Sequence, residues 1–128
     1  MASPSAPLSK LRKLIGEFPE TSERISHGAP TYSGAARIWG GKKTFASFHA
    51  NHHGDGRIAL WCKQPEGVQA TLVEADPKTF FVPPYVGTSG WLGVRLDRRP
   101  DWGMVRDLLE EGYRTVAPKC AIARLDGD

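Results

Sequence analysis

The sequence has 128 residues, of which 40% are hydrophobic and 24% are charged. This length matches one typical domain, and this composition excludes disordered, collagen-like and coiled-coil proteins. Lysine and arginine outnumber acidic residues by 17 to 14, which gives a formal net charge of +3. Such a small excess permits binding to a polyanion without requiring it.

Two further features bear on where the protein works. The longest uncharged stretch, residues 79–94, contains Pro83 and Pro84 and is shorter than the roughly 20 apolar residues of a membrane helix. The N-terminus lacks a basic segment followed by an apolar run, so no secretory signal is predicted. Cys62 and Cys120 are isolated, which favours free thiols in a reducing compartment. We therefore expect a cytoplasmic protein with no membrane association.

The first half of the chain predicts a helix followed by strands. Residues 1–7 are expected to form a flexible tail. Apolar residues recur every three or four positions from Leu8 to Phe18, which predicts an amphipathic helix that ends near Pro19. Aromatic and β-branched runs then alternate with glycine-containing turns too short for parallel crossovers, so antiparallel strands follow. These strands are expected at 24–26, 30–33, 35–39, 43–49 and 57–62, with hairpins at 33–34 and 40–42 and a longer turn at 51–56.

The second half predicts two helices around one further strand. Pro65 suits the first turn of a helix that ends before Asp76. Residues 79–85 predict a short edge segment and a rigid loop, and residues 91–97 predict a strand. Asp101 is a candidate N-cap for a helix whose buried stripe contains Trp102, Val105, Leu108, Leu109, Gly112 and Val116.

This order of elements predicts an α+β fold. Residues 8–128 are expected to form a single domain, in which helices pack on one face of an antiparallel β-sheet.

Six stretches together resemble the MmcQ/YjbR family of small bacterial proteins. They are ERISHGAPTY (23–32), GGKKTFASF (40–48), ALWCK (59–63), FFVPPYVGTSGWLGVRLD (80–97), DWGMVRDLL (101–109) and YRTVAPK (113–119). The resemblance implies a frataxin-like fold, also described as a double wing. Proteins of this family are commonly labelled DNA-binding, and the resemblance implies neither an enzymatic activity nor a cofactor. It leaves the oligomeric state open.

Basic residues supply candidate contacts to DNA phosphates. Lys42 and Lys43 follow two glycines at a predicted hairpin tip, which suits either a wing beside a phosphate backbone or an ordinary solvated turn. Aromatic residues Phe81, Tyr85 and Trp91 precede a group of arginines, a pattern that suits stacking on bases as well as ordinary packing. We expect one band of phosphate-binding cations with low sequence selectivity: Lys42, Lys43, Lys63, Arg95, Arg98, Arg99 and Lys119.

Histidines suggest two alternatives to DNA binding. His49, His52, His53 and Asp55 are ligand types that zinc or nickel accepts, although a polar turn is the favoured interpretation. His27 stands beside a glycine and near a proline, where it could act as a general base or order a turn, and the structural role is favoured.

Aromatic residues carry the remaining alternatives. A small-ligand pocket, in a binding protein or an enzyme, would be lined by His27, Tyr32, Trp61, Tyr85 and Trp91. The aromatic loop could instead bind another protein. No phosphate-loop motif is present in the sequence, so nucleotide hydrolysis is not expected.

Overall fold

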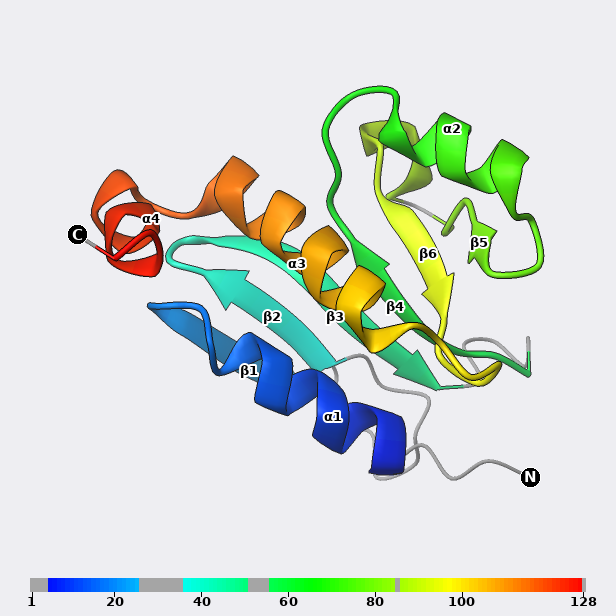
Figure 1. Ribbon diagram of the computed structural model, residues 1–128, viewed down its shortest axis with the longest axis horizontal. Helices are drawn as coiled ribbons and strands as arrows, with labels where there is room; N and C mark the ends of the chain where they lie inside the picture. The colour runs from blue at the N-terminus through cyan, green and yellow to red at the C-terminus, as the bar shows by residue number, and fades with distance from the viewer. Residues whose placement is uncertain (1–4, 26–35, 51–55, 85, 128) are drawn as a thin grey trace.

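The computed structural model describes residues 5–25, 36–50, 56–84 and 86–127. The strands within these ranges form one antiparallel sheet in the order β1-β2-β3-β4-β6-β5 (Figure 1). The predicted α+β fold is confirmed. The elements in chain order are α1 (Ser5–Ile15), β1 (Thr21–Ile25), β2 (Ala36–Gly40), β3 (Lys43–Ala50), β4 (Ile58–Cys62), α2 (Val68–Ala75), β5 (Phe80–Phe81), the 3-10 turn η2 (Gly87–Ser89), β6 (Leu92–Arg95), α3 (Trp102–Val116) and α4 (Lys119–Leu125).

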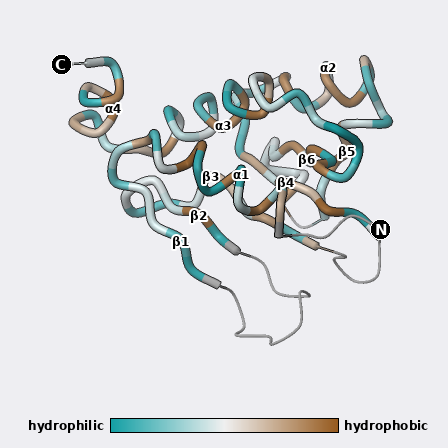
Figure 2. The backbone as a smooth tube through the Cα atoms, turned by 60° about the horizontal axis from the view of Figure 1, so that its bottom comes forward, coloured by the Kyte–Doolittle hydropathy of each residue, from teal (hydrophilic) through white to brown (hydrophobic). Residues whose placement is uncertain are grey.

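The core lies between the sheet and its helices. Helices α1 and α3 cross the same face of the sheet, and Figure 2 shows α2, α3 and α4 along one side of the strands. Leu11 of α1 and Leu109 of α3 are fully buried in one core cluster that also contains Leu60 and Val94 of the sheet. Burying each such side chain contributes about 1.5–3 kcal/mol, so this one face supplies most of the hydrophobic stabilisation.

A β-bulge separates the two ends of the β2–β3 hairpin. Ile38 pairs with Ala46 but Trp39 pairs with Thr44, so Phe45 is an extra residue in β3. Its ring packs towards α3, 5.6 Å from the ring of Tyr113. Bulges increase twist and redirect side chains, and this bulge lies beside Trp39.

Two helices begin elsewhere than the sequence predicts. α1 begins at Ser5, so residues 5–7 are not a tail, and Pro7 fits because the first N–H groups of a helix have no intrahelical acceptor. α2 begins at Val68 rather than at Pro65, because Gly67 adopts the left-handed φ of 88° immediately before it. α2 ends before Asp76 as predicted, whereas α1 ends at Ile15 rather than near Pro19.

The third predicted helix is confirmed and a fourth follows it. The carboxylate of Asp101 accepts hydrogen bonds from the backbone N–H groups of Gly103 and Met104 at 3.0 and 3.2 Å, as an N-cap does. α4 was not predicted. Its seven residues span less than two turns, too few for a clear period, although Ala121 is buried in the core.

Four of the five early strands occur close to their predicted positions, as β1, β2, β3 and β4. The strand predicted at 30–33 lies outside the described residues. The edge segment predicted within 79–85 is β5, which pairs only with β6.

Candidate nucleic-acid interface

The sheet has a second face, opposite to the one that packs on α1 and α3. Side chains alternate along a strand, and the cross-strand register shows which residues share a face. One row runs across all six strands through Arg24, Arg37, Ser47, Trp61, Gly93 and Phe81. We call the outer face the set Ser22, Arg24, Arg37, Trp39, Thr44, Ser47, His49, Ala59, Trp61, Phe81, Gly93 and Arg95.

Two arginines and a tryptophan form a cluster at the β1–β2 edge of the outer face. Arg24 and Arg37 are direct cross-strand partners, and both are exposed. The guanidinium carbon of Arg24 lies 4.8 Å from the ring centroid of Trp39, within cation–π range. Like charges directly opposite each other on adjacent strands are destabilising. A bound anion would remove that repulsion.

Trp39 contributes an unused donor to this cluster. Its side chain is half-buried, and its indole Nε1 is fully buried and has no hydrogen-bond partner among the described residues. Buried indole N–H groups usually find an acceptor, since leaving one unpaired costs about 1–3 kcal/mol. The cluster therefore combines two exposed positive charges with a donor that no described residue satisfies.

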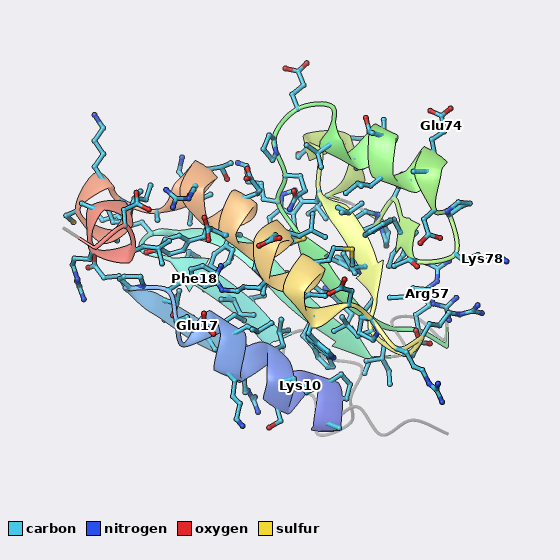
Figure 3. All side chains as sticks on the ribbon, viewed as in Figure 1. Lys10, Glu17, Phe18, Arg57, Glu74 and Lys78 are labelled. Atoms are coloured by element: carbon cyan, nitrogen blue, oxygen red, sulfur yellow. The ribbon has the colours of Figure 1, made fainter. Side chains whose placement is uncertain are left out.

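The arginines on the helical side of the molecule are compensated by carboxylates. Arg12 pairs with Glu23 at 2.6 Å, and Arg106 contacts Glu17 at 2.9 Å. Glu17 and Phe18, labelled in Figure 3, lie at the end of α1 near α3. Arg114 bridges Glu110 and Asp126, and its hydrogen bonds lower the pKa of both carboxyl groups. Within the described ranges, by contrast, no carboxylate pairs with Arg24 or Arg37.

The seven cations predicted from the sequence fall into two groups rather than one band. Lys42 and Lys43 are exposed at the β2–β3 hairpin tip. Lys63 follows β4 at the same end, where its backbone N–H donates to Phe45 O at 2.8 Å. Lys119 also lies there, because the adjacent Pro118 is 2.9 Å from the position that a Cβ on Gly41 would take.

Arg95, Arg98 and Arg99 lie at the opposite end of the sheet. Arg95 is opposite Ala59 at the start of β4, the end where Arg57 is labelled in Figure 3. The eight residues of β3 separate the two ends by roughly 25 Å, at about 3.3 Å per residue. These three arginines therefore form a separate patch.

Arg95 is already engaged within its patch. Its guanidinium donates to both carboxylate oxygens of Asp97, at 3.1 and 2.9 Å. Partial burial of Asp97 raises its pKa, but the hydrogen bonds and charge of Arg95 outweigh burial and leave the pKa below its usual value. Arg98 and Arg99 are exposed beside this pair.

The centre of the outer face is buried. Ser47 Oγ and His49 Nε2 form a 2.8 Å hydrogen bond, and the His49 ring stacks on Trp61 with centroids 3.5 Å apart. Ser47, His49 and Trp61 are only 7%, 7% and 5% exposed. A hydroxyl–imidazole pair can activate a nucleophile, but this burial gives the pair a structural role in holding Trp61.

Of the four predicted metal ligands, the structure describes only His49. His52, His53 and Asp55 lie outside the described residues. Within the part of the chain that the structure describes, no three His, Cys, Asp or Glu side chains are grouped as metal ligands.

The alternative pocket is also only partly described. His27, Tyr32 and Tyr85 lie outside the described residues. Trp61 is buried against His49, and Trp91 is half-buried, with its backbone carbonyl accepting a hydrogen bond from Gln69. Phe81 is half-buried under the Arg57 guanidinium, 4.2 Å from the ring centroid.

Sequence reasoning missed Arg24, Arg37 and Trp39. The alternation of Arg37 and Trp39 on one strand was visible in the sequence. The pairing of Arg24 with Arg37 was not, because the segment 26–35 separates their strands and leaves the register open.

The described residues define a small α+β protein whose six strands form one antiparallel sheet, and the outer face of this sheet carries an exposed arginine pair. The YjbR family model matches residues 16–115, more than half of the chain, so the chain belongs to the YjbR family. The crystal structure of Deinococcus radiodurans protein DR2400, which carries the DUF419 domain, superposes with a TM-score of 0.72 at 17% identity over 98% of this chain and 92% of that one. No curated protein matches significantly. No helix in the described ranges has the length and apolar character to span a bilayer.

Proposed function

We propose that this YjbR protein is a non-enzymatic nucleic-acid-binding protein that contacts phosphates with low sequence selectivity. The observation that carries the proposal is the exposed arginine pair, Arg24 and Arg37, which has no carboxylate partner among the described residues. Guanidinium groups bind phosphate oxygens in two-pronged fashion. A polyanion would bind both arginines and remove their mutual repulsion.

Further cations lie at the hairpin end of the same strands. Lys42 and Lys43 follow Trp39 at the β2–β3 tip, where Lys43 pairs with Gly40 and so lies on the helical side of the sheet rather than on the outer face. Lys63 and Lys119 border the same end. Cations grouped near an aromatic ring are typical of surfaces that bind a nucleic-acid backbone.

Low sequence selectivity follows from the kind of contact. The longest helix, α3, carries arginines that are already paired with Glu17, Glu110 and Asp126, so it is a poor recognition helix for a major groove. Contacts made by strand arginines and hairpin lysines to phosphates fix position without distinguishing bases.

The test compares two double variants of equal charge. Arg24→Gln/Arg37→Gln removes the uncompensated pair, and Arg98→Gln/Arg99→Gln removes two exposed arginines at the far end of the sheet. We expect the first variant to lose roughly tenfold or more in affinity for a labelled oligonucleotide, because each charged hydrogen bond contributes about 1.5–3 kcal/mol. The second should bind like the native protein. Fluorescence anisotropy measures both affinities.

Salt titration gives an independent readout. Loss of two phosphate contacts should reduce the slope of log affinity against log salt concentration by up to about 2. Circular dichroism checks that both variants remain folded. Equal affinities and equal slopes for the two variants, or no binding by the native protein, would refute this function.

A further inference from the structure

We infer that the nucleic acid bound at this face is single-stranded and that one of its bases stacks at the Trp39–Arg24 pair. The inference rests on the proposed function and specifies its ligand. It draws on three observations: the exposed guanidinium over a half-buried indole, an indole N–H with no partner among the described residues, and the position of this cluster at the β1–β2 edge of the sheet.

The stacked pair offers a platform for a base. Arg24 lies over the Trp39 ring at 4.8 Å, and both side chains retain solvent-accessible surface. Bases stack on aromatic rings and on guanidinium planes, and both surfaces are present here. In a duplex the base faces are hidden by neighbouring pairs, whereas in a single strand they are accessible.

The groups around the platform match the rest of a nucleotide. Arg37, directly opposite Arg24 in the register, is exposed and can take the phosphate of the same strand. The buried Nε1–H of Trp39 has no acceptor in the part of the chain that the structure describes. A small movement of the indole on binding would let this donor reach a ligand oxygen, so occupancy would satisfy a group that the free protein leaves unpaired.

The position of the cluster also suits a single strand. Arg24, Arg37 and Trp39 lie at the β1–β2 edge of the outer face, and Ser47, His49 and Trp61 at the centre of that face are buried, so the exposed contact area is small. An exposed site of this size suits one unstacked base and its phosphate. The major groove of B-DNA is about 12 Å wide and admits a helix or a two-stranded ribbon. The competing geometry is insertion of the β2–β3 hairpin tip into a duplex groove, which would depend on Lys42 and Lys43 and not on Trp39.

The experiment measures anisotropy of the full chain with three labelled ligands of one sequence. They are single-stranded DNA and RNA of about 12 nucleotides, within the known range of single-strand site sizes, and the matching DNA duplex. We expect one or both single strands to bind at least about five-fold more tightly than the duplex, since stacking of one base supplies that much. The DNA and RNA arms identify which sugar the face accepts.

Two variants separate stacking from charge. Trp39→Leu should weaken single-strand binding by at least about five-fold and leave duplex binding unchanged. Arg24→Lys keeps the charge but loses the planar guanidinium, so it should weaken single-strand binding selectively as well. The matched control is Trp102→Leu, which removes an indole with a cation, Lys10, 5.5 Å above it on the helical side. If Trp39→Leu does not fold, Trp39→Phe, which retains an aromatic ring, is measured in its place.

The results with the three ligands distinguish the single-strand inference from the proposed phosphate-binding function. Duplex binding equal to or tighter than single-strand binding, or single-strand binding that is insensitive to Trp39→Leu and Arg24→Lys, overturns the single-strand inference while phosphate binding survives. If none of the three ligands binds the native protein, both the proposed function and this inference are wrong.

Discussion

Cys62 and Cys120 occupy opposite environments. Cys120 is exposed, whereas Cys62 is fully buried in β4, and this burial raises the pKa of its thiol to about 12. Because the thiolate is the reactive form, Cys62 should resist alkylation near neutral pH. We expect a thiol reagent to label one cysteine per folded chain, Cys120, and both cysteines after denaturation, as counted by mass spectrometry. Comparable labelling rates for both thiols in the folded protein would contradict this.

Single residues also show where sequence reasoning stops. The sequence identifies Lys42 and Lys43 as cations at a hairpin tip, and both are exposed there. It could not place Arg95 at the other end of the sheet, because that position depends on β6 pairing with β4 across a connection that contains α2. The periodicity of apolar residues predicts a single helix or strand. The residues that surround a charged side chain, in contrast, depend on how several strands and helices pair.

The contact between α3 and β4 depends on a glycine. A Cβ on Gly112 would lie 2.6 Å from the backbone oxygen of Lys63, closer than side chains tolerate. We expect Gly112→Ala to lower the free energy of unfolding by about 1–3 kcal/mol, as overpacking does, despite the better helix propensity of alanine. Urea denaturation measures the change.

Gly103 provides the control within the same helix. The nearest atom to a Cβ there is the Asp101 carboxylate oxygen at 3.3 Å, on an exposed side chain that can shift. A shift of a few tenths of an ångström is enough and keeps the N-cap hydrogen bonds of Asp101, so Gly103→Ala should change stability by no more than about 0.5 kcal/mol. If the two alanine variants unfold at the same urea concentration, the close approach of α3 to β4 does not limit stability.

Elements with a strong local signal could be predicted from the sequence. α3 has a capping aspartate and a buried stripe from Val105 to Tyr113, and both features follow from residue type and spacing. The boundary at Gly67 and the short helix α4 depend on a left-handed backbone and on packing of Ala121 into a core built elsewhere. Such tertiary effects have no periodic signature in the chain.

Charge is divided between the two sides of the whole molecule. On the helical side, Arg106 and Arg114 of α3 connect α1 and α4 through Glu17, Glu110 and Asp126. The outer face keeps its arginine pair without carboxylate partners among the described residues. The net charge of +3 does not show how these charges divide between the two sides, so composition alone could not indicate the exposed arginine pair.

The ion-pair network predicts a loss of stability in acid. Hydrogen bonds from Arg114 lower the pKa of Glu110 and of Asp126. A carboxyl group with a lowered folded-state pKa stabilises the fold fully above its unfolded pKa of about 4, and this contribution disappears as pH falls through the folded-state value. The free energy of unfolding should therefore decline below about pH 4.

The variant Arg114→Gln isolates this effect. Without the guanidinium, the two carboxyl groups should return towards their ordinary pKa values, so the variant should lose less stability in acid than the native protein does. Urea midpoints across the acid range provide the comparison. Parallel pH curves for the two proteins would show that other groups cause the acid sensitivity.

The contacts of Tyr113 have a consequence for biosynthesis. Its ring stacks on Phe18 at 5.1 Å, and its hydroxyl donates to the backbone oxygen of Pro19, 94 positions earlier in the chain. The turn that leads into β1 therefore receives its final support only after α3 has left the ribosome. During translation β1 can pair with β2 first, and the turn that joins β1 to α1 is fixed later, once the last third of the polypeptide has been synthesised.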